Sequence, residues 1–535
     1  MKSNKYFSKK SEKNEYPLTV GQKGLWFLHQ LDPLSDRYHM PLTFKFNNQV
    51  NVDDLEKILT VFIQRHSMMN STFHEVDGAP VRRINVPQAV RMTEHDVTDL
   101  KHQGLLQKIR KLSGKPFNLE NGPLLRAHVL HGFQGGRILL ITIHHLIFDG
   151  ASLKLLCDEM ELIYRSFIND SQLQAVEYDY NDFQTWQQQW LQSEDAQLSQ
   201  GYWLKKLAGE LPQLNLPIDY ASNKNEIIKG EFLKFSIPKS IVDNFKQLAL
   251  DTKCSEYLIW LTIYFAFLSR YTSQKDLIVG TPSMGRPEAQ FDEFIGYFVN
   301  LIPIRCQLHP HENFIDLLHR FKNDIYEALM HADYPLPELI SALGDANQRG
   351  DQPLFQTSFI WTVTEHLKSE SDSQLGLEIY PLLHESGEQN LSLEVITSEE
   401  GISCLLKYRT NCFSAASVSR IKQSFLNFID SISIEPDCEI QELSLVTEDD
   451  ENFLLHTLNE TNMDYPNEWC IHQLFEEQVK KTPDEVAIIF EERSLSYTEL
   501  NQQANQLAHY LIEQGVKTDS LVGLCLKRSP EMIVA

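Results

Sequence analysis

Two adjacent histidines followed by an aspartate and a glycine are the residues of this chain best suited to chemistry. They lie in residues 138–150, I-L-L-I-T-I-H-H-L-I-F-D-G, where an Ile-rich apolar run predicts a buried strand. Because side chains alternate across a strand, we expect His144 and His145 to point to opposite faces, which argues against one metal bound by both. One histidine would then face a reaction space, close to Asp149 and to Gly150, whose backbone a ligand can approach. This arrangement suits acyl transfer.

The residues after the glycine predict the helix that holds this corner. Leu153, Leu156, Met160, Ile163 and Phe167 recur at spacings of three and four and form one apolar stripe. We interpret this stripe as core. The alternative for the histidines themselves is that both are satisfied core residues, the commoner fate of a lone histidine beside apolar neighbours.

Hydrophobic periodicity along the rest of the chain predicts an α/β protein. The predicted strands are residues 41–47, 138–143, 276–281, 299–307, 355–362, 391–397 and 401–408. The predicted helices are residues 52–65, 152–167, 183–207, 240–250, 255–271 and 314–332. The pattern restarts near residue 181, which predicts two lobes, 16–180 and 181–450, after a disordered tail at 1–15.

Composition excludes several classes of function. A chain of 535 residues is too long for one core and suggests about two to four domains. Its formal net charge of −25 argues against nucleic acid or an anionic membrane as the main partner. The eight cysteines form no C-x-x-C pair, so we expect free thiols, no zinc site and a cytoplasmic location. The strongest apolar run, 257–268, is too short to span a bilayer.

The motif H-H-x-x-x-D-G resembles the signature of the condensation domains of nonribosomal peptide synthetases. Six further segments resemble other motifs of that family and occur in the same order. They are 18–26 (L-T-V-G-Q-K-G-L-W), 65–73 (R-H-S-M-M-N-S-T-F), 180–187 (Y-N-D-F-Q-T-W-Q), 295–305 (I-G-Y-F-V-N-L-I-P-I-R), 331–338 (H-A-D-Y-P-L-P-E) and 349–356 (R-G-D-Q-P-L-F-Q). The departures include Lys23-Gly24 in place of the usual Arg, and Leu301 where Thr is common. None touches the H-H-x-x-x-D-G.

The resemblance implies a fold and a reaction. The fold is two chloramphenicol-acetyltransferase-like lobes in a V-shaped pseudo-dimer with a central tunnel. The reaction is amide formation between a donor acyl thioester and an acceptor aminoacyl amine, each delivered on the 4′-phosphopantetheine of a carrier protein. No directly bound cofactor is expected. His145 would orient the attacking nitrogen or accept its proton, and the Gly150 backbone N–H would face the developing oxyanion.

Other residues are expected to support the site. Asp149, between a buried strand and a helix, must be paired, because an unpaired buried carboxylate is too costly. The resemblance suggests an arginine as its partner, with Arg305 the first candidate and Arg65 the second. His144 is expected to pack. Three residues, Tyr297, Asn300 and Met284, are candidates for the tunnel wall, although the first two are equally good packing residues.

Residues 451–470 are turn-rich and predict a linker. Beyond them, I-H-Q-L-F-E-E-Q-V, T-P-D and L-S-Y-T-E-L in residues 471–535 resemble the start of an adenylation domain. No phosphate loop ending in Lys occurs, so this stretch by itself should not cradle ATP. We expect it to be the N-terminal fragment of such a domain.

Three functions stay open from the sequence. The first is amide-forming condensation, in natural-product or antibiotic biosynthesis. The second is a non-catalytic carrier-docking platform, which an intact His145 and Asp149 disfavour. The third is an ester- or amide-forming acyltransferase with a soluble acceptor, which the adenylation-like end disfavours. We expect a monomer whose donor carrier arrives in trans, with adenylation and acceptor carrier domains downstream, and the spellings at 295–305 and 331–338 favour a fatty or polyketide donor.

Overall fold

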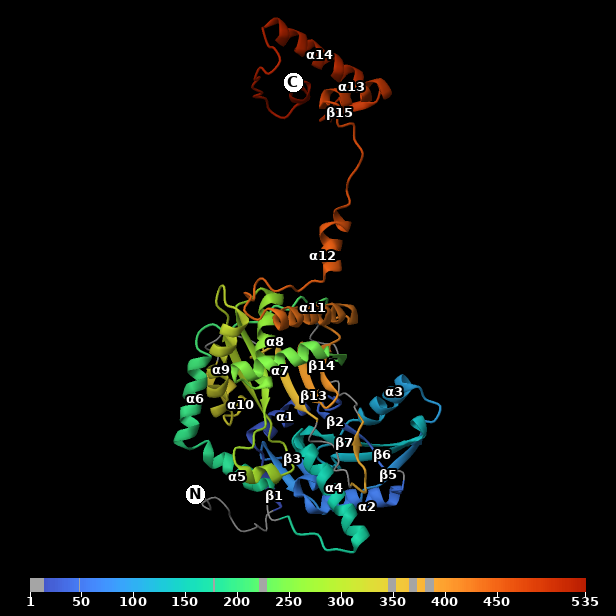
Figure 1. Cartoon of the computed structure of the whole chain (residues 1–535), viewed down its shortest axis with the longest axis vertical. Coiled ribbons are helices and arrows are strands. Elements are labelled where there is room, and N and C mark those ends of the chain that lie inside the picture. Colours follow the sequence, from blue (N-terminus) through green and yellow to red (C-terminus); the bar gives the residue numbers. More distant parts are fainter. Residues whose placement is uncertain are drawn as a thin grey trace. The chain divides into compact units, whose positions relative to one another are not determined.

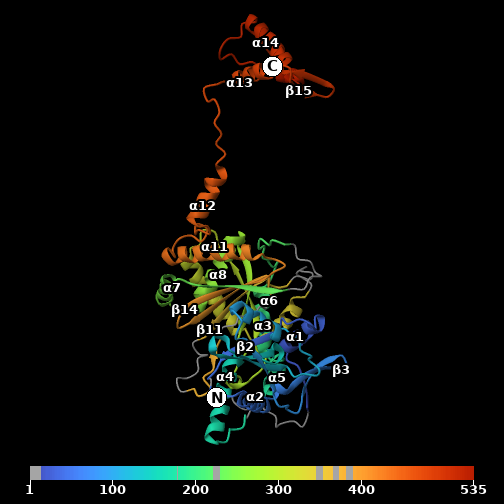
Figure 2. The same cartoon turned by 90° about the vertical axis from the view of Figure 1, so that its right-hand side faces the viewer.

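The computed structural model describes residues 14–47, 49–176, 179–220, 229–344, 353–364, 373–380 and 389–535. Most of the predicted tail and the first residues of the last motif, 349–352, lie outside them. The chain divides into two compact units between Thr447 and Glu448. The larger unit is an α/β structure with two main sheets (Figures 1 and 2), which confirms the predicted class.

The first sheet is five-stranded, in the order β12-β2-β7-β6-β5. Its strands are β2 (His39–Lys45), β5 (Met92–Asp96), β6 (Leu125–His131), β7 (Arg137–His144) and β12 (Glu378–Ile379). Helices α1 (Val20–Leu31), α2 (Val52–Arg65), α3 (His102–Ser113) and α4 (Ser152–Asn169) accompany it. A small sheet of β1 (Glu15–Pro17), β4 (Ala79–Ile84) and β3 (Ser71–Val76) lies in the same part of the chain. Glu15, assigned to the disordered tail, is therefore in a strand and pairs with Arg83.

Both faces of β7 are buried. On β7, Leu139, Ile141 and Ile143 join a core that includes buried residues of α2 and α4. The intervening Ile138 and Leu140 join a smaller core with the apolar face of α3. Successive side chains of β7 thus enter two different cores, and both cores are apolar. For this reason the sequence of β7 is one continuous apolar run.

The second sheet is six-stranded, in the order β10-β9-β11-β13-β14-β8. Its strands are β8 (Gly230–Ser236), β9 (Asp276–Ser283), β10 (Asn300–Gln307), β11 (Thr357–Val363), β13 (Leu391–Ser398) and β14 (Gly401–Arg409). Helices α7 (Lys239–Thr252), α8 (Glu256–Thr272), α9 (Phe314–Met330), α10 (Leu336–Leu343) and α11 (Ala415–Ile434) belong to this part of the chain. Residues 258–268 of α8 are all buried, so the apolar run at 257–268 is a core helix.

Two features of the larger unit differ from the periodicity. The single helix expected at 183–207 is two helices, α5 (Tyr180–Trp190) and α6 (Glu194–Lys206). The break occurs because Ser193 caps α6, its Oγ accepting a hydrogen bond from the Ala196 N–H at 3.2 Å. The second feature is β12, which comes late in the chain yet pairs with β2 of the first sheet.

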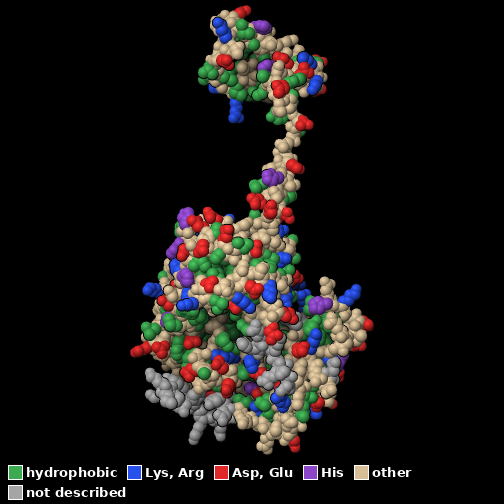
Figure 3. Space-filling model, in the orientation of Figure 1, with side chains coloured by type: hydrophobic (Ala, Val, Ile, Leu, Met, Phe, Trp, Pro, Cys, Tyr) green, Lys and Arg blue, Asp and Glu red, His purple; other side chains and the backbone are tan. Residues whose placement is uncertain are grey.

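The smaller unit is described by itself. It contains α12 (Glu448–Leu455), α13 (Ile471–Lys481), the hairpin of β15 (Val486–Phe490) and β16 (Arg493–Ser496), α14 (Tyr497–Glu513) and α15 (Pro530–Val534). The first turn of α12 is acidic. On the face of the larger unit shown in Figure 3, acidic and basic side chains are scattered rather than gathered by sign. None of the helices in the described ranges combines the length and the apolar character needed to cross a membrane.

Candidate active site

His144 is the last residue of β7 and lies opposite His39 on β2. Its Nδ1 accepts a hydrogen bond from the Leu146 N–H at 3.1 Å, and its ring packs edge-on against those of His29, His39 and Phe117. Burial holds the pKa of His144 well below its usual value, and the neighbouring histidines lower it further. The residue is thus a neutral side chain packed among other rings.

His145 begins the short 3₁₀ turn His145–Ile147, and its ring has different surroundings. The His145 N–H donates to the Tyr38 carbonyl at 2.7 Å, and Gln22 of α1 holds the next residue by donating to the Leu146 carbonyl at 3.0 Å. The His145 ring is half-buried and meets the ring of Tyr297 edge-on, with centroids 5.2 Å apart. The two histidines therefore contact different sets of neighbours.

The hydrogen bond of the His145 ring assigns its tautomer. Nδ1 lies 2.7 Å from the carbonyl oxygen of Phe148. A carbonyl can only accept, so Nδ1 carries the proton, and in the neutral imidazole Nε2 then holds the lone pair. The corner of the strand thus presents a nitrogen that can accept a hydrogen bond or a proton.

Asp149 is completely buried, and its carboxylate accepts five hydrogen bonds. The N–H and hydroxyl of Ser152 donate to Oδ1 at 2.8 and 2.7 Å, which anchors the start of α4. The Phe298 N–H donates to Oδ2 at 3.1 Å. The remaining two come from Arg286, whose Nη1 and Nη2 lie 2.9 and 3.0 Å from Oδ2 and Oδ1. The carboxylate is fully satisfied, as a buried charge must be.

Arg286 is the partner of Asp149, and the prediction of Arg305 or Arg65 is wrong. Arg305 on β10 pairs instead with Asp276 on the adjacent strand β9, at 2.6 Å. Arg65, at the end of α2, pairs with Glu159 of α4. Both arginines have a carboxylate close by within their own part of the fold.

Arg286 lies two residues after Met284, the predicted wall residue, and was not among the candidates that the sequence offered for this pair. Its guanidinium is 2% exposed, lies over the Phe298 ring at 4.2 Å and also donates to the Phe291 and Phe294 carbonyls. Arg286 therefore holds the loop after β9 together through these carbonyls. Through Asp149 it also connects this loop to the turn that follows β7.

Gly285 allows this loop to close. Its φ is +63°, a conformation that L side chains rarely adopt, and an added Cβ would lie 1.7 Å from the Phe298 carbonyl oxygen. Gly150 is different, because its φ is not positive and a Cβ there would meet nothing within 4 Å. It is exposed. Neither the backbone nor the neighbouring residues of the chain require a glycine at position 150.

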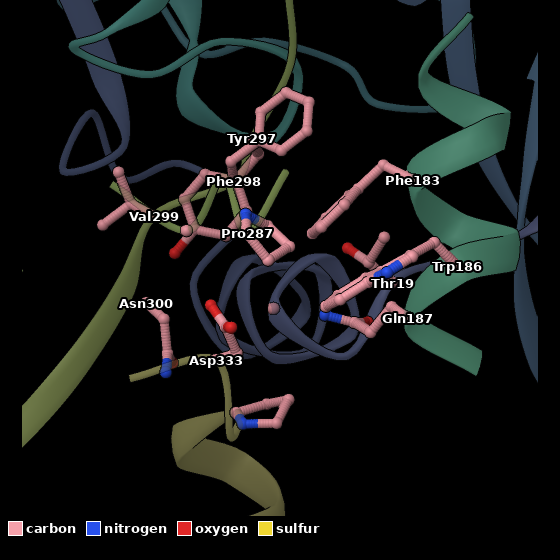
Figure 4. Close-up of a pocket in the computed structure, with 13 residues that line it drawn as sticks. Thr19, Phe183, Trp186, Gln187, Pro287, Tyr297, Phe298, Val299, Asn300 and Asp333 are labelled. Atoms are coloured by element: carbon pink, nitrogen blue, oxygen red, sulfur yellow. The ribbon is translucent and has the colours of Figure 1, made fainter. Parts of the chain in front are cut away.

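Tyr297, whose ring contacts His145, also lines a pocket. Its lining includes Tyr297 and Asn300, two of the three predicted wall residues. Met284 is not among them and is 64% exposed. Asn300 is also a structural residue: its side-chain amide donates to the Ala332 and Tyr334 carbonyls, each at 2.8 Å, and its Oδ1 accepts from the Leu336 N–H. Figure 4 shows the lining residues.

The family model for the condensation domain matches residues 12–455, and the model for AMP-binding enzymes matches residues 475–535. The chain belongs to the condensation-domain family. Polyketide synthase PksN of Bacillus subtilis is 32% identical over 526 residues, and gramicidin S synthase 2 of Brevibacillus brevis is 32% identical over 523. These alignments cover 97% and 98% of this chain, but only 10% and 12% of the relatives. The chain thus spans about a tenth of their length.

Solved structures support the same fold. A four-domain nonribosomal peptide synthetase, holo-AB3403 bound to AMP and glycine, matches with a TM-score of 0.79 and 20% identity, over 94% of this chain and 39% of that one. The condensation domain of the Monacolin K polyketide synthase MokA matches with a TM-score of 0.69 and 18% identity, over 80% of this chain and 99% of that one. The condensation-domain fold expected from the motifs is confirmed.

The condensation-domain site is built from both lobes. The first sheet supplies His145 and Asp149, and the loop between β9 and β10 supplies Arg286 and Tyr297. In the part of the chain that the structure describes, no group of three or more His, Cys, Asp or Glu is placed to hold a metal ion. The residues present can position a nucleophile and accept its proton.

Proposed function

We propose that residues 16–450 form an amide between a carrier-bound donor acyl group and a carrier-bound acceptor amine. The observation that supports this most is the ring of His145, whose Nδ1–H is held by the Phe148 carbonyl and whose Nε2 is the acceptor nitrogen. The acceptor amine hydrogen-bonds to Nε2 and attacks the thioester carbonyl. The new C–N bond forms, the C–S bond breaks, and the proton taken by Nε2 passes to the departing thiolate.

Gly150 and Asp149 have separate parts in this proposal. The N–H of exposed Gly150 faces the oxyanion of the tetrahedral species. Asp149 does not touch substrate: it fixes, through Arg286, the corner that aims His145. His144 supports the same corner from within the core. Substrates arrive on 4′-phosphopantetheine, and the domain itself uses no other cofactor.

The proposed partners are the other domains of a modular synthetase. Residues 471–535 are the beginning of an adenylation domain, and 451–470 link it to the condensation domain. The acceptor carrier belongs downstream and the donor carrier acts in trans. The spellings G-Y-F-V-N and D-Y-P-L-P favour a fatty or polyketide acyl donor over an aminoacyl donor.

The decisive experiment measures product on the acceptor carrier by intact-protein mass spectrometry. We expect His145→Ala to lower turnover by about 10²–10⁴-fold, the usual contribution of a positioned acid–base group, without a change in melting temperature. His102→Ala, at an exposed histidine of α3, is the matched control and should keep turnover. Normal product from a folded His145→Ala protein would overturn the role given to His145, whereas a parent chain that binds both loaded carriers but forms no product would favour the carrier-docking platform.

The same assay resolves the donor and the acceptor. An acyl-loaded and an aminoacyl-loaded carrier compete for one acceptor, and preference for the acyl donor is expected. Preference for the aminoacyl donor would remove that part of the proposal. Efficient turnover of a soluble amine or alcohol without the acceptor carrier would favour the acyltransferase alternative.

A further inference from the structure

The pocket lined by Tyr297 holds a carboxylate that nothing in the condensation chemistry uses. It is formed by residues of α1, α5, the loop after β9, the start of β10 and the loop before α10, and its lining includes Phe183, Trp186, Tyr297, Phe298, Asn300 and Asp333. In Figure 4 the Asp333 carboxylate points toward the middle of the pocket, and Phe183 and Trp186 stand on the wall across from it. Asp333 is the one acidic residue of this lining, and no basic residue belongs to it.

Asp333 has no hydrogen-bond or ion-pair partner within the described ranges of the chain. Burial alone raises the pKa of its carboxyl to about 6, so at neutral pH it is still mainly ionised. A partly buried carboxylate without a partner is costly. Asp149 shows how the same protein satisfies a carboxylate that serves structure.

The carboxylate is held in this position by its neighbours. Asn300 donates to the carbonyls on both sides of it, Ala332 and Tyr334, and Trp203 donates to the His331 carbonyl at 2.9 Å. The adjacent helix end does not use Asp333 either. Thr19 caps α1, and Gln187 accepts from the Val20 N–H at 2.8 Å. The charge therefore projects from a loop whose backbone carbonyls are hydrogen-bonded on both sides of it.

The dimensions of the pocket limit what can reach this charge. Its empty space, counted together with the solvent at its opening, is about 390 Å³. A pocket of this size limits the ligand to a small group on a short chain. The aromatic walls favour a cation over a neutral group, because ring faces attract positive charge.

We propose that the pocket at Asp333 binds a protonated primary amine carried on an unbranched apolar stem. The ammonium group meets the carboxylate, and the stem lies along Phe183, Trp186 and Phe298. Two sources can supply this group: the side chain of a basic acceptor residue, or a free alkylamine. The first source rests on the proposed function. Tyr297 lines this pocket and also contacts His145. An acceptor whose α-amine lies at His145 would therefore have its side chain close to Tyr297 and to this pocket.

The first arm of the test measures binding to the whole chain without any condensation assay. Calorimetric or NMR titration should show n-butylammonium binding, with n-butanol and butyrate at least about tenfold weaker, as expected for loss of one charge-assisted hydrogen bond. Asp333→Asn should weaken n-butylammonium by a similar factor. Asp292→Asn, which removes one charge at an exposed residue near the same loop, should not.

Asp333→Glu keeps the charge and gives a second variant should the asparagine protein fail to fold. It should retain n-butylammonium binding and shift the preference to a shorter amine. Equal affinity for butanol and butylammonium, or an Asp333→Asn protein that binds the amine as tightly as the parent, would overturn the proposal.

The second arm identifies the source. Acceptor carriers loaded with lysine and with norleucine are compared by kcat/KM. A preference for lysine of about tenfold or more, lost in Asp333→Asn, assigns the site to the acceptor side chain. Equal rates together with n-butylammonium binding assign it to a free amine. No condensation with either carrier would overturn the proposed function, and the binding arm would still decide the pocket.

Discussion

The two sheets of the larger unit bury different kinds of side chain. In the first lobe, the buried groups include His39, His144, Asp149 and the guanidinium of Arg82. Around the second sheet, α8 is buried along eleven consecutive residues, and the buried polar groups are mostly hydroxyls such as Thr262 and Thr357. The first lobe therefore depends on particular polar pairings, whereas the second depends on apolar packing. The site combines them, since the apolar lobe projects the loop whose arginine completes the polar corner.

This difference predicts that charge removal damages the first lobe most. Arg286→Ala leaves Asp149 buried without its cation, which should cost about 3–5 kcal/mol of unfolding free energy. Denaturant unfolding measures it. Arg305→Ala is the comparison in the second lobe: its partner Asp276 is 30% exposed, so water hydrates the carboxylate left behind and a smaller loss is expected. Equal losses for the two variants would contradict the assignment of Arg286 as the structural partner.

A cavity in the second lobe should cost nearly as much by another mechanism. Leu393 lies on β13 and is fully buried in the apolar core. Leu393→Ala should lower the unfolding free energy by about 2–5 kcal/mol through lost burial and the cavity left behind. Because no charge is involved, the loss should be the same at pH 7 and pH 5.5. A loss that changes with pH would show that the second lobe is not the apolar platform described above.

Residues 373–380, which include β12, cross from the second lobe to the first sheet. Weakening their attachment should lower the unfolding free energy by an intermediate amount. Glu161 of α4 accepts hydrogen bonds from the Ser373 hydroxyl and from the N–H groups of Gln374 and Leu375, at 2.7, 3.0 and 3.0 Å. Glu161→Ala should cost about 2 kcal/mol, since bonds to a charged acceptor are worth more than neutral ones. Hydrogen exchange at Leu375 and Leu377 should rise before exchange at β7. Unchanged protection there would mean that pairing of β12 with β2 holds the segment without Glu161.

Mild acid should weaken the first lobe by the smallest of these effects. Burial lowers the pKa of His39 to about 4, below its value of about 6.5 in an unfolded chain. Between these values the unfolded state binds the proton and the folded state does not, so stability falls as pH drops below 6.5. His39 alone should remove about 1 kcal/mol between pH 7 and 5.5.

His39→Gln should reduce that slope of unfolding free energy against pH, and His102→Gln, at an exposed histidine, should leave it as it is. His39 is 2% exposed, so screening by solvent is slight. A slope that survives His39→Gln in full would assign the acid sensitivity to other buried groups of this lobe.

Elements set by local pattern could be read from the sequence closely. The helix expected at 52–65 is α2 to the residue, and the strand expected at 138–143 lies within β7. Asn51 caps α2 and apolar residues recur along its buried face. The helix expected at 183–207 was wrong because its stripe continues across a break that one serine cap creates. Hydrophobic periodicity indicates which residues face a core, but it does not locate the end of a helix.

By itself, the sequence determined the fold class, the family and the position of His145, because these depend on short motifs and on the alternation of side chains along one strand. Only the tertiary structure decided that Arg286 pairs with Asp149, that β12 joins the first sheet, and that Asp333 has no partner within the described residues. Asp149 and Arg286 are 137 residues apart. A buried carboxylate needs a cationic partner, and from the sequence Arg305 or Arg65 met that requirement equally well. Which two groups meet depends on how the loop after β9 folds over the end of β7. That depends on backbone conformation and packing across the two lobes, which no local pattern records.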